Sequence, residues 1–156
     1  MFRESVPLSE APMIGGNLIG AISFETAALQ TRTAKASEID ELGHVNNAVY
    51  LVWAQEVAVA HWATLAGAKL LAAHVWVVLR HEIDYRDPIL EGERVEVRTW
   101  LGRASGPRFA RHIDIRRAGA KRFSAQVLSD WCLLDAATRK PMRVGPEILA
   151  AFGVAG

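Results

Sequence analysis

One apolar segment decides the fold of this chain: AVYLVWAQEVAVAHWATLAGA, residues 48–68. Its length and composition are typical of a helix that is apolar on nearly all faces and has to be covered by other elements. The segment is also long enough to cross a bilayer. However, Gln55, Glu56 and His61 stand near its middle, where polar groups are costly in a membrane. We therefore expect a buried helix over residues 48–65.

The chain after this helix has the period of β-strands. Gly67 is a suitable helix end, and apolar and polar side chains alternate beyond it, as they do along a strand. We expect strands over residues 74–86, 94–103, 108–117 and 121–135, after a first strand within residues 21–35. In the strand after the helix, one face should carry Val75, Val77, Leu79, Ile83 and Tyr85. Short links between the last four strands favour an antiparallel meander.

These elements predict an α+β fold in which a five-stranded antiparallel sheet wraps around one long central helix. Residues 1–20 are expected to form a loose N-terminal lead-in, and residues 21–156 to form a single domain. One sheet of this size leaves part of the helix uncovered. We therefore expect a homodimer, joined through sheet edges or faces, and such dimers can pair into tetramers.

The composition narrows the classes of function. The length of 156 residues suits one domain, with 51% hydrophobic and 22% charged residues. The net charge of +1 gives no general attraction to nucleic acid or to acidic membranes, so neither is an expected partner. Cys132 is the only cysteine, which excludes an intrachain disulfide and a cysteine-rich metal site. We expect a cytoplasmic protein without a metal or cofactor, since a lone cysteine fits a reducing compartment.

Polar residues stand directly before the helix, in IDELGHVNNAVYLVWAQE, residues 39–56. Asn46 or Asn47 can cap the helix, because an asparagine side chain accepts from the free amides of a first helical turn. Taken alone, an aspartate in such a loop, like Asp40, is usually a turn or capping residue.

Three separated stretches have a common resemblance: DELGHVNNAVYLVW (40–53), IDYRDPILEGERVEVRTW (83–100) and DAATRKPMRVGPEI (135–148). In this order they resemble segments of the 4-hydroxybenzoyl-CoA thioesterase family, whose members are acyl-CoA thioesterases with the hotdog fold. The resemblance covers roughly residues 22–150. Plant acyl-carrier-protein thioesterases share the His-Val-Asn-Asn core, but they carry an asparagine where this chain has Leu42.

The resemblance implies hydrolysis of an acyl-CoA substrate to coenzyme A and a carboxylic acid. It implies that Asp40 is the catalytic carboxylate, as nucleophile or general base, and that the backbone N–H of Asn47 polarises the thioester carbonyl. Physical reasoning agrees, since first-turn amides lack helical partners and lie at the positive end of the helix dipole. His44 either orients the substrate and assists proton transfer, or holds the loop by hydrogen bonds. Some related hotdog enzymes use a helix glutamate as catalyst, but with different flanking residues. Glu56 either has such a role, or it pairs with a basic residue or faces a dimer partner.

Substrate-binding residues are expected in two places. Tyr50 and Trp53 follow the loop at helical spacing and either belong to the core or line an acyl pocket between helix and sheet. The resemblance implies that GRASGPR, residues 102–108, lies along the pantetheine arm and nucleotide of coenzyme A. There we expect contacts from Arg103, Ser105 and Arg108, since guanidinium groups match phosphate oxygens. The remaining basic residues of this region should form a solvated outer face: Arg116, Arg117, Lys121 and Arg122.

Two other functions compete with hydrolysis. A hotdog dehydratase or hydratase would carry a different acid–histidine motif before the helix, and the sequence has none. A non-catalytic acyl-CoA-binding module would keep the fold and bind acyl-CoA without releasing coenzyme A.

Overall fold

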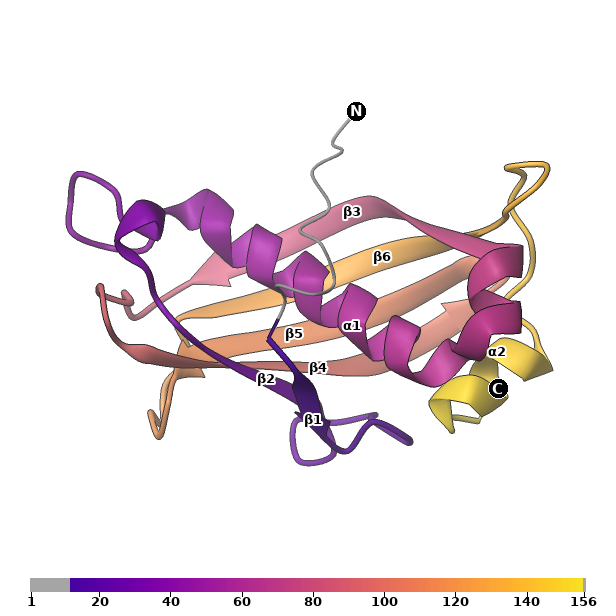
Figure 1. The fold of residues 1–156 in the computed structure, drawn as a ribbon, viewed down its shortest axis with the longest axis horizontal. Helices are drawn as coiled ribbons and strands as arrows, with labels where there is room; N and C mark the ends of the chain where they lie inside the picture. The colour runs from indigo at the N-terminus through magenta and orange to yellow at the C-terminus, as the bar shows by residue number, and fades with distance from the viewer. Residues whose placement is uncertain (1–11, 156) are drawn as a thin grey trace.

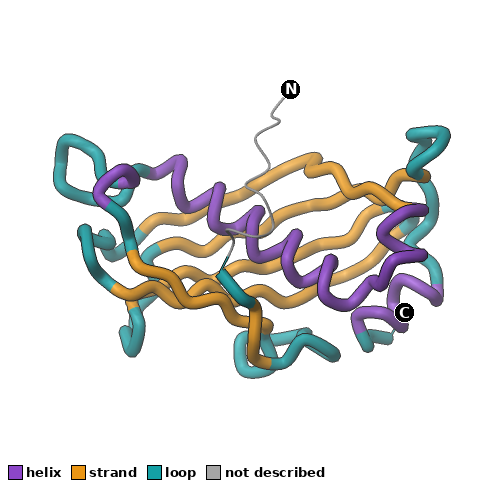
Figure 2. Tube along the Cα trace, in the orientation of Figure 1, coloured by secondary structure: helices purple, strands orange, loops and turns teal. Residues whose placement is uncertain are grey.

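The computed structural model describes residues 12–155. Its elements in chain order are strand β1 (Ile14–Gly16), strand β2 (Ala28–Thr33), the short 3-10 helix η1 (Ala36–Glu38), helix α1 (Asn47–Ala73), strands β3 (His74–Tyr85), β4 (Arg94–Ser105), β5 (Arg108–Arg117) and β6 (Ala125–Asp135), and helix α2 (Pro146–Phe152). Figures 1 and 2 show α1 lying across one face of a single sheet, with α2 beside the far end of α1. The predicted sheet around a central helix is confirmed.

The sheet has six strands in the order β1-β2-β4-β5-β6-β3, and every neighbouring pair is antiparallel. The predicted number of five was wrong because β1 pairs with β2, within the stretch expected to be a lead-in. Two of its three residues are glycines, so it has no alternating pattern that a sequence reading could detect. Residues 1–11 of the expected lead-in lie outside the described residues.

Strand β3 occupies an edge of the sheet and pairs with β6, not with β4 (Figure 1). The expected meander therefore holds for β4, β5 and β6 only. The reason is that β2 takes the other side of β4, so the chain leaving α1 can join the sheet only beyond β6.

A bulge in β3 changes which side chains face the helix. Val78 pairs with Trp131 and Arg80 pairs with Asp130, which leaves Leu79 as an extra residue. The extra residue reverses the alternation, so the prediction of one continuous apolar face along this strand was wrong. Trp76 packs toward the core before the bulge, as Ile83 does after it, whereas Leu79 is 55% exposed.

Helix α1 extends beyond its predicted end. Gly67 has φ 71° and ψ 167°, a conformation essentially restricted to glycine, so the helix does break there as expected. A further helical segment then continues to Ala73. Helix α2 was not anticipated, and its Phe152 is fully buried against the end of α1.

The core lies between α1 and the sheet in two clusters. Trp53 and Val57 belong to the cluster under the first half of α1, and Trp62 and Phe152 belong to the one under its second half. The alternation predicted for β4 and β6 is confirmed by buried residues of their inner face: Val95, Val97, Thr99, Leu101, Ala125, Val127, Trp131 and Leu133. Within residues 12–155, none of the helices combines the length and the apolarity that crossing a bilayer requires.

Candidate active site

The loop before α1 is closed by hydrogen bonds between its two ends. The main-chain N–H of Asp40 donates to the carbonyl of His44 at 2.8 Å, and that of Gly43 donates to the carbonyl of Asp40 at 3.0 Å. Gly43 has φ 80°, which a residue with a side chain rarely adopts. The loop therefore bends Asp40 back toward the start of the helix, as expected.

The carboxylate of Asp40 uses its two oxygens differently. Oδ1 accepts from the main-chain N–H groups of Leu42 at 2.9 Å and His44 at 3.2 Å. Oδ2 accepts no hydrogen bond from any residue in the range 12–155. Asp40 is thus a turn residue through one oxygen, while the second oxygen remains available for chemistry.

Helix α1 starts with an unpaired donor. Asn46 is the N-cap, and its Oδ1 accepts from the N–H of Ala48 at 3.0 Å. The N–H of Asn47 makes no hydrogen bond with the described residues, and Asn47 is exposed. Its carbonyl accepts from the Tyr85 hydroxyl at 3.0 Å, which ties the helix start to the end of β3. The side chain of His44 also makes no hydrogen bond within residues 12–155, so this histidine holds the loop through its main chain.

Two aromatic residues pack beneath this loop. The Tyr50 ring is buried and packs edge-on against Trp53 at 5.7 Å and Tyr85 at 5.6 Å between ring centroids. Burial raises the pKa of the Tyr50 phenol, and the charge of nearby Asp40 adds to the rise. Trp53 is fully buried, and its Nε1 donates to Glu38 at 2.8 Å. Tyr50 and Trp53 therefore belong to the core, which is one of the two roles expected for them; the other was to line an acyl pocket.

Glu56 forms an ion pair. Its carboxylate lies 2.6 Å from the guanidinium of Arg32, which also stacks over the Trp53 ring at 5.1 Å. Both partners are nearly buried, with 15% and 12% of their side chains exposed. This position supports the ion-pair interpretation of Glu56.

The residues expected to contact coenzyme A lie at the other end of the molecule. Arg103, Ser105 and Arg108 are exposed on and around the β4–β5 hairpin. The carbonyl of Gly106 in that hairpin accepts from Val144, just before α2. In Figure 1 the loop before α1 and helix α2 occupy opposite ends of the fold. One chain therefore does not bring these three residues to Asp40, and Arg108 forms an ion pair with Asp130.

Comparison with known proteins shows which family the chain belongs to. A family model described as the thioesterase-like superfamily matches residues 34–152, which is most of the chain. The chain belongs to the thioesterase-like superfamily. The protein is therefore a thioester hydrolase, as the motifs before the helix predicted. No curated protein matches the sequence significantly.

Solved structures of thioesterases have the same hotdog fold. The 1,4-dihydroxy-2-naphthoyl-CoA thioesterase Slr0204 from Synechocystis is 17% identical, with a TM-score of 0.68 over 80% of this chain and 93% of its own. The probable thioesterase YbaW from Escherichia coli is 20% identical, with a TM-score of 0.69 over 80% and 96%. A DHNA-CoA thioesterase from Staphylococcus aureus is 18% identical, with a TM-score of 0.68 over 80% and 87%.

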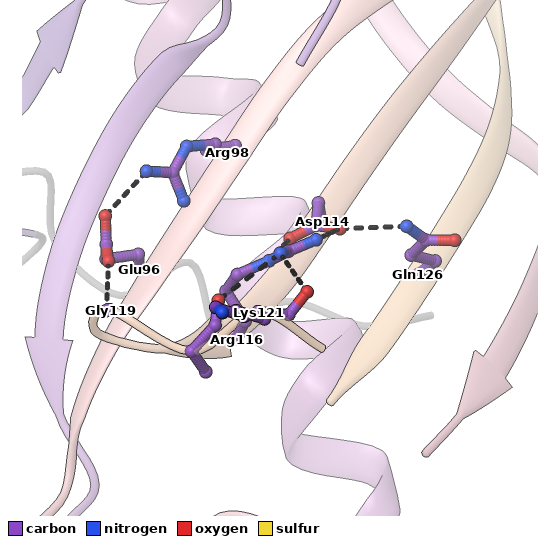
Figure 3. Close-up of polar contacts among 8 residues, drawn as sticks. Glu96, Arg98, Asp114, Arg116, Gly119, Lys121 and Gln126 are labelled. Carbon is purple, nitrogen blue, oxygen red and sulfur yellow. Dashed lines mark hydrogen bonds and ion pairs between the residues drawn. The ribbon is translucent and has the colours of Figure 1, made fainter. Parts of the chain in front are cut away.

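Basic side chains of β4 and β5 in this thioesterase form a polar network with acidic neighbours on the sheet face away from α1 (Figure 3). Arg116 donates from Nε and Nη2 to both oxygens of Asp114, at 2.7 and 2.8 Å. The Phe24 ring is contacted by the guanidinium groups of Arg98 and Arg116, each 4.7 Å from its centroid. Lys121 and Arg122 are exposed as expected, but Arg116 is largely buried, because its partner Asp114 is fully buried.

The thioesterase also contains a buried arginine whose burial was not predicted from the sequence. Arg111 is 5% exposed and lines a cavity of about 230 Å³ between α1, α2 and the sheet. The alternation of side chains along β5 indicates this burial, because position 111 is in phase with the buried residues Phe109 and Ile113. Asp40 lines neither this cavity nor a second pocket beside Trp100.

Proposed function

We propose that this thioester hydrolase is an acyl-CoA thioesterase that releases coenzyme A and a carboxylic acid. One observation carries the proposal: a carboxylate oxygen and a main-chain N–H, both without partners among the described residues, belong to the same loop and helix start. These are Oδ2 of Asp40 and the N–H of Asn47. Thioester hydrolysis needs a nucleophile or base near the carbonyl carbon and a donor for the oxygen that becomes negative.

The reaction then uses the two groups together. The thioester oxygen accepts from the Asn47 N–H, where the positive end of the helix dipole stabilises developing negative charge. Asp40 either attacks the carbonyl carbon, giving an anhydride that water hydrolyses, or removes a proton from an attacking water. The C–S bond breaks, and the thiolate of coenzyme A takes up a proton. His44 is suited to assist that transfer, because its imidazole has no partner in residues 12–155.

A homodimer completes the site in this proposal. Strand β3 is a 12-residue edge strand with no neighbour on its outer side in the described chain. Such an edge is a template for pairing with another strand. Several apolar side chains of α1 and β3 are exposed: Val52, Val59, Leu71, Val77 and Leu79. A two-fold axis buries them against the same residues of the partner.

Two-fold pairing of β3 is antiparallel, which exchanges the two ends of the molecule. Pairing along the whole strand sets His74 of one chain against the partner's Tyr85. Tyr85 is bonded to Asn47, so the helix start of one chain comes beside the cavity and the β4–β5 hairpin of the other. Arg103, Ser105 and Arg108 then contact coenzyme A held at the partner's Asp40, and the cavity receives the acyl group.

The test of the catalytic assignment is Asp40→Asn. The change keeps an acceptor at Oδ1 for the loop amides but removes the charge, so coenzyme A release should fall about 10²- to 10⁴-fold. Release is measured by thiol trapping on a panel of acyl-CoA thioesters. Glu41→Gln, the loss of the neighbouring exposed carboxylate, is the matched control and should keep full activity.

Two results would contradict the proposal. Full activity of Asp40→Asn on every thioester that the parent hydrolyses would show that Asp40 is not the catalytic carboxylate. Tight binding of acyl-CoA by the parent without thiol release would indicate the non-catalytic binding module instead.

A further inference from the structure

The cavity under the second half of α1 has an aromatic lining. Trp62 of the helix, Trp76 of β3 and Trp131 of β6 surround it, together with Phe109 and Phe152. Its volume of about 230 Å³ is somewhat below the range of drug-sized pockets, so it suits a small apolar group. Trp62 lies roughly 22 Å along the helix from Asn47, at the usual helical rise.

Arg111 brings a positive charge to this apolar lining. Its Nη1 donates to His61 Nδ1 at 3.0 Å and to Thr99 Oγ1 at 2.9 Å. Within residues 12–155 no carboxylate lies within ion-pairing distance of it. Burial lowers the pKa of the Arg111 guanidinium to about 9, so it is still charged at neutral pH. An arginine is rarely buried in this way unless it is paired.

The neighbours of Arg111 carry no compensating charge. Because a guanidinium only donates, Nδ1 of His61 accepts, and the proton is on Nε2, which donates to the Leu18 carbonyl at 2.6 Å. Burial and the charge of Arg111 lower the pKa of His61 to about 4, so the imidazole is neutral. Thr99 donates to the His112 carbonyl at 3.0 Å. The cluster therefore has a net charge of +1.

Two further donors in the cavity lining are unpaired. The Nε1 atoms of Trp76 and Trp131 are buried and have no acceptor within the described residues. A buried donor without an acceptor costs about 1–3 kcal/mol. The lining thus combines one buried cation, which contacts the Phe152 ring at 5.6 Å but has no carboxylate partner among residues 12–155, with an otherwise apolar surface.

We propose that this cavity binds the far end of the acyl group and that this end carries a carboxylate. The substrate class is then a coenzyme A thioester of an acid with an apolar body and a second, free carboxylate. A carboxylate supplies the negative charge that Arg111 lacks. The assignment rests on the proposed function, because only the two-fold dimer brings the cavity of one chain to the partner's Asp40.

Binding of free acids tests the cavity without catalysis. The probes are benzoate and hexanoate, compared with their uncharged amides, and titrations are followed by tryptophan fluorescence and calorimetry. Each acid should bind at least tenfold more tightly than its amide. Arg111→Met should abolish this difference, while Arg111→Lys, which keeps the charge, retains part of it. Asp40→Asn should leave the difference unchanged.

Hydrolysis of matched thioesters tests the acyl assignment. The pairs are adipyl-CoA with hexanoyl-CoA and suberyl-CoA with octanoyl-CoA, which differ by the terminal carboxylate. In at least one pair kcat/KM should be tenfold or more higher for the carboxylated member. Arg111→Met should lose this preference, so that its kcat/KM values for the two members of a pair differ by less than threefold.

The outcomes separate the two proposals. If no thioester is hydrolysed but the acids bind through Arg111, the proposed function fails and the carboxylate site stands. If thioesters are hydrolysed without any preference and the amides bind as tightly as the acids, the carboxylate site fails and the function stands. Preference in binding without preference in hydrolysis would overturn the assignment of the cavity to the acyl group.

Discussion

At the scale of single residues, Asp40 has a structural role in the loop and a proposed catalytic role. Its Oδ1 holds the loop amides of Leu42 and His44, and its Oδ2 has no partner among residues 12–155. Asparagine and alanine at position 40 therefore separate the two roles. Asparagine retains an oxygen acceptor without the charge, and alanine removes both.

We predict that Asp40→Ala and Asp40→Asn lose activity alike but differ in stability. Loss of the acceptor for two loop amides should lower the free energy of unfolding of Asp40→Ala by about 1–2 kcal/mol relative to Asp40→Asn. Urea unfolding of the two variants measures the difference. Equal stabilities would mean that the loop hydrogen bonds contribute nothing to the folded state.

His61 predicts a dependence of stability on pH. Its pKa of about 4 in the folded state lies below the ordinary value of 6.5, mainly through burial and then through Arg111. The unfolded chain therefore binds more protons between these values, so stability is lost as the pH falls from 6.5 to 4. The loss attributable to His61 is on the order of 3 kcal/mol.

The measurement is the free energy of unfolding against pH for the parent and for His61→Gln. His81 and His112, whose pKa values burial also lowers, add to the slope in both proteins. The difference between the two curves isolates His61. Parallel curves from pH 6.5 to 4 would contradict the buried neutral imidazole.

At the scale of elements, the break in α1 shapes the cavity. Gly67 has φ 71° and ψ 167°, and the residues after it include Leu71 and His74 of the cavity lining. An added Cβ at Gly67 would meet no atom within 4 Å. The cost of a side chain there is therefore conformational and not steric.

We predict that Gly67→Ala lowers the free energy of unfolding by about 1–3 kcal/mol, the usual cost of a non-glycine residue in this conformation. Gly145→Ala is the matched control, since Gly145 has φ −95° and only an ordinary contact at 3.9 Å. Chemical denaturation compares the two. A Gly67→Ala variant as stable as the control would show that the helix can straighten without loss.

At the scale of the whole molecule, apolar side chains are exposed on α1 and on the edge strand β3. Val52 and Val59 are exposed, are seven residues apart and lie on the same side of α1. In the proposed function, Arg103, Ser105 and Arg108 of one chain complete the site at the other chain's Asp40. Association and activity are therefore expected to be lost together.

We predict that the double variant Val52→Glu with Val59→Glu is monomeric and inactive although Asp40 is intact. Buried like charges at a two-fold interface repel each other and lose hydration. Sedimentation velocity and thiol release are measured on the same samples, with Ile22→Glu, an exposed residue away from this surface, as control. An active monomer would refute the shared site.

Several features were predictable because their causes are local. The buried helix follows from its apolar run, the strands β4 and β6 follow from alternation, and the helix cap follows from the amide side chain of Asn46. The thioesterase family was recognisable for the same reason, since its motif is a loop followed directly by a helix start. Neighbouring residues alone determine such patterns.

Other features were decided only by tertiary structure. Strand β3 lies beside β6 because β2 occupies the side of β4, and its bulge at Leu79 depends on the partner strand. The sequence by itself determined the helix, the alternating strands and the polar loop at Asp40, because each depends on residues within a few positions. Tertiary structure alone decided that Arg111 is buried without a counter-ion among residues 12–155 and that the hairpin with Arg108 lies at the opposite end of the fold from the loop with Asp40, because burial and distance depend on residues remote in the chain.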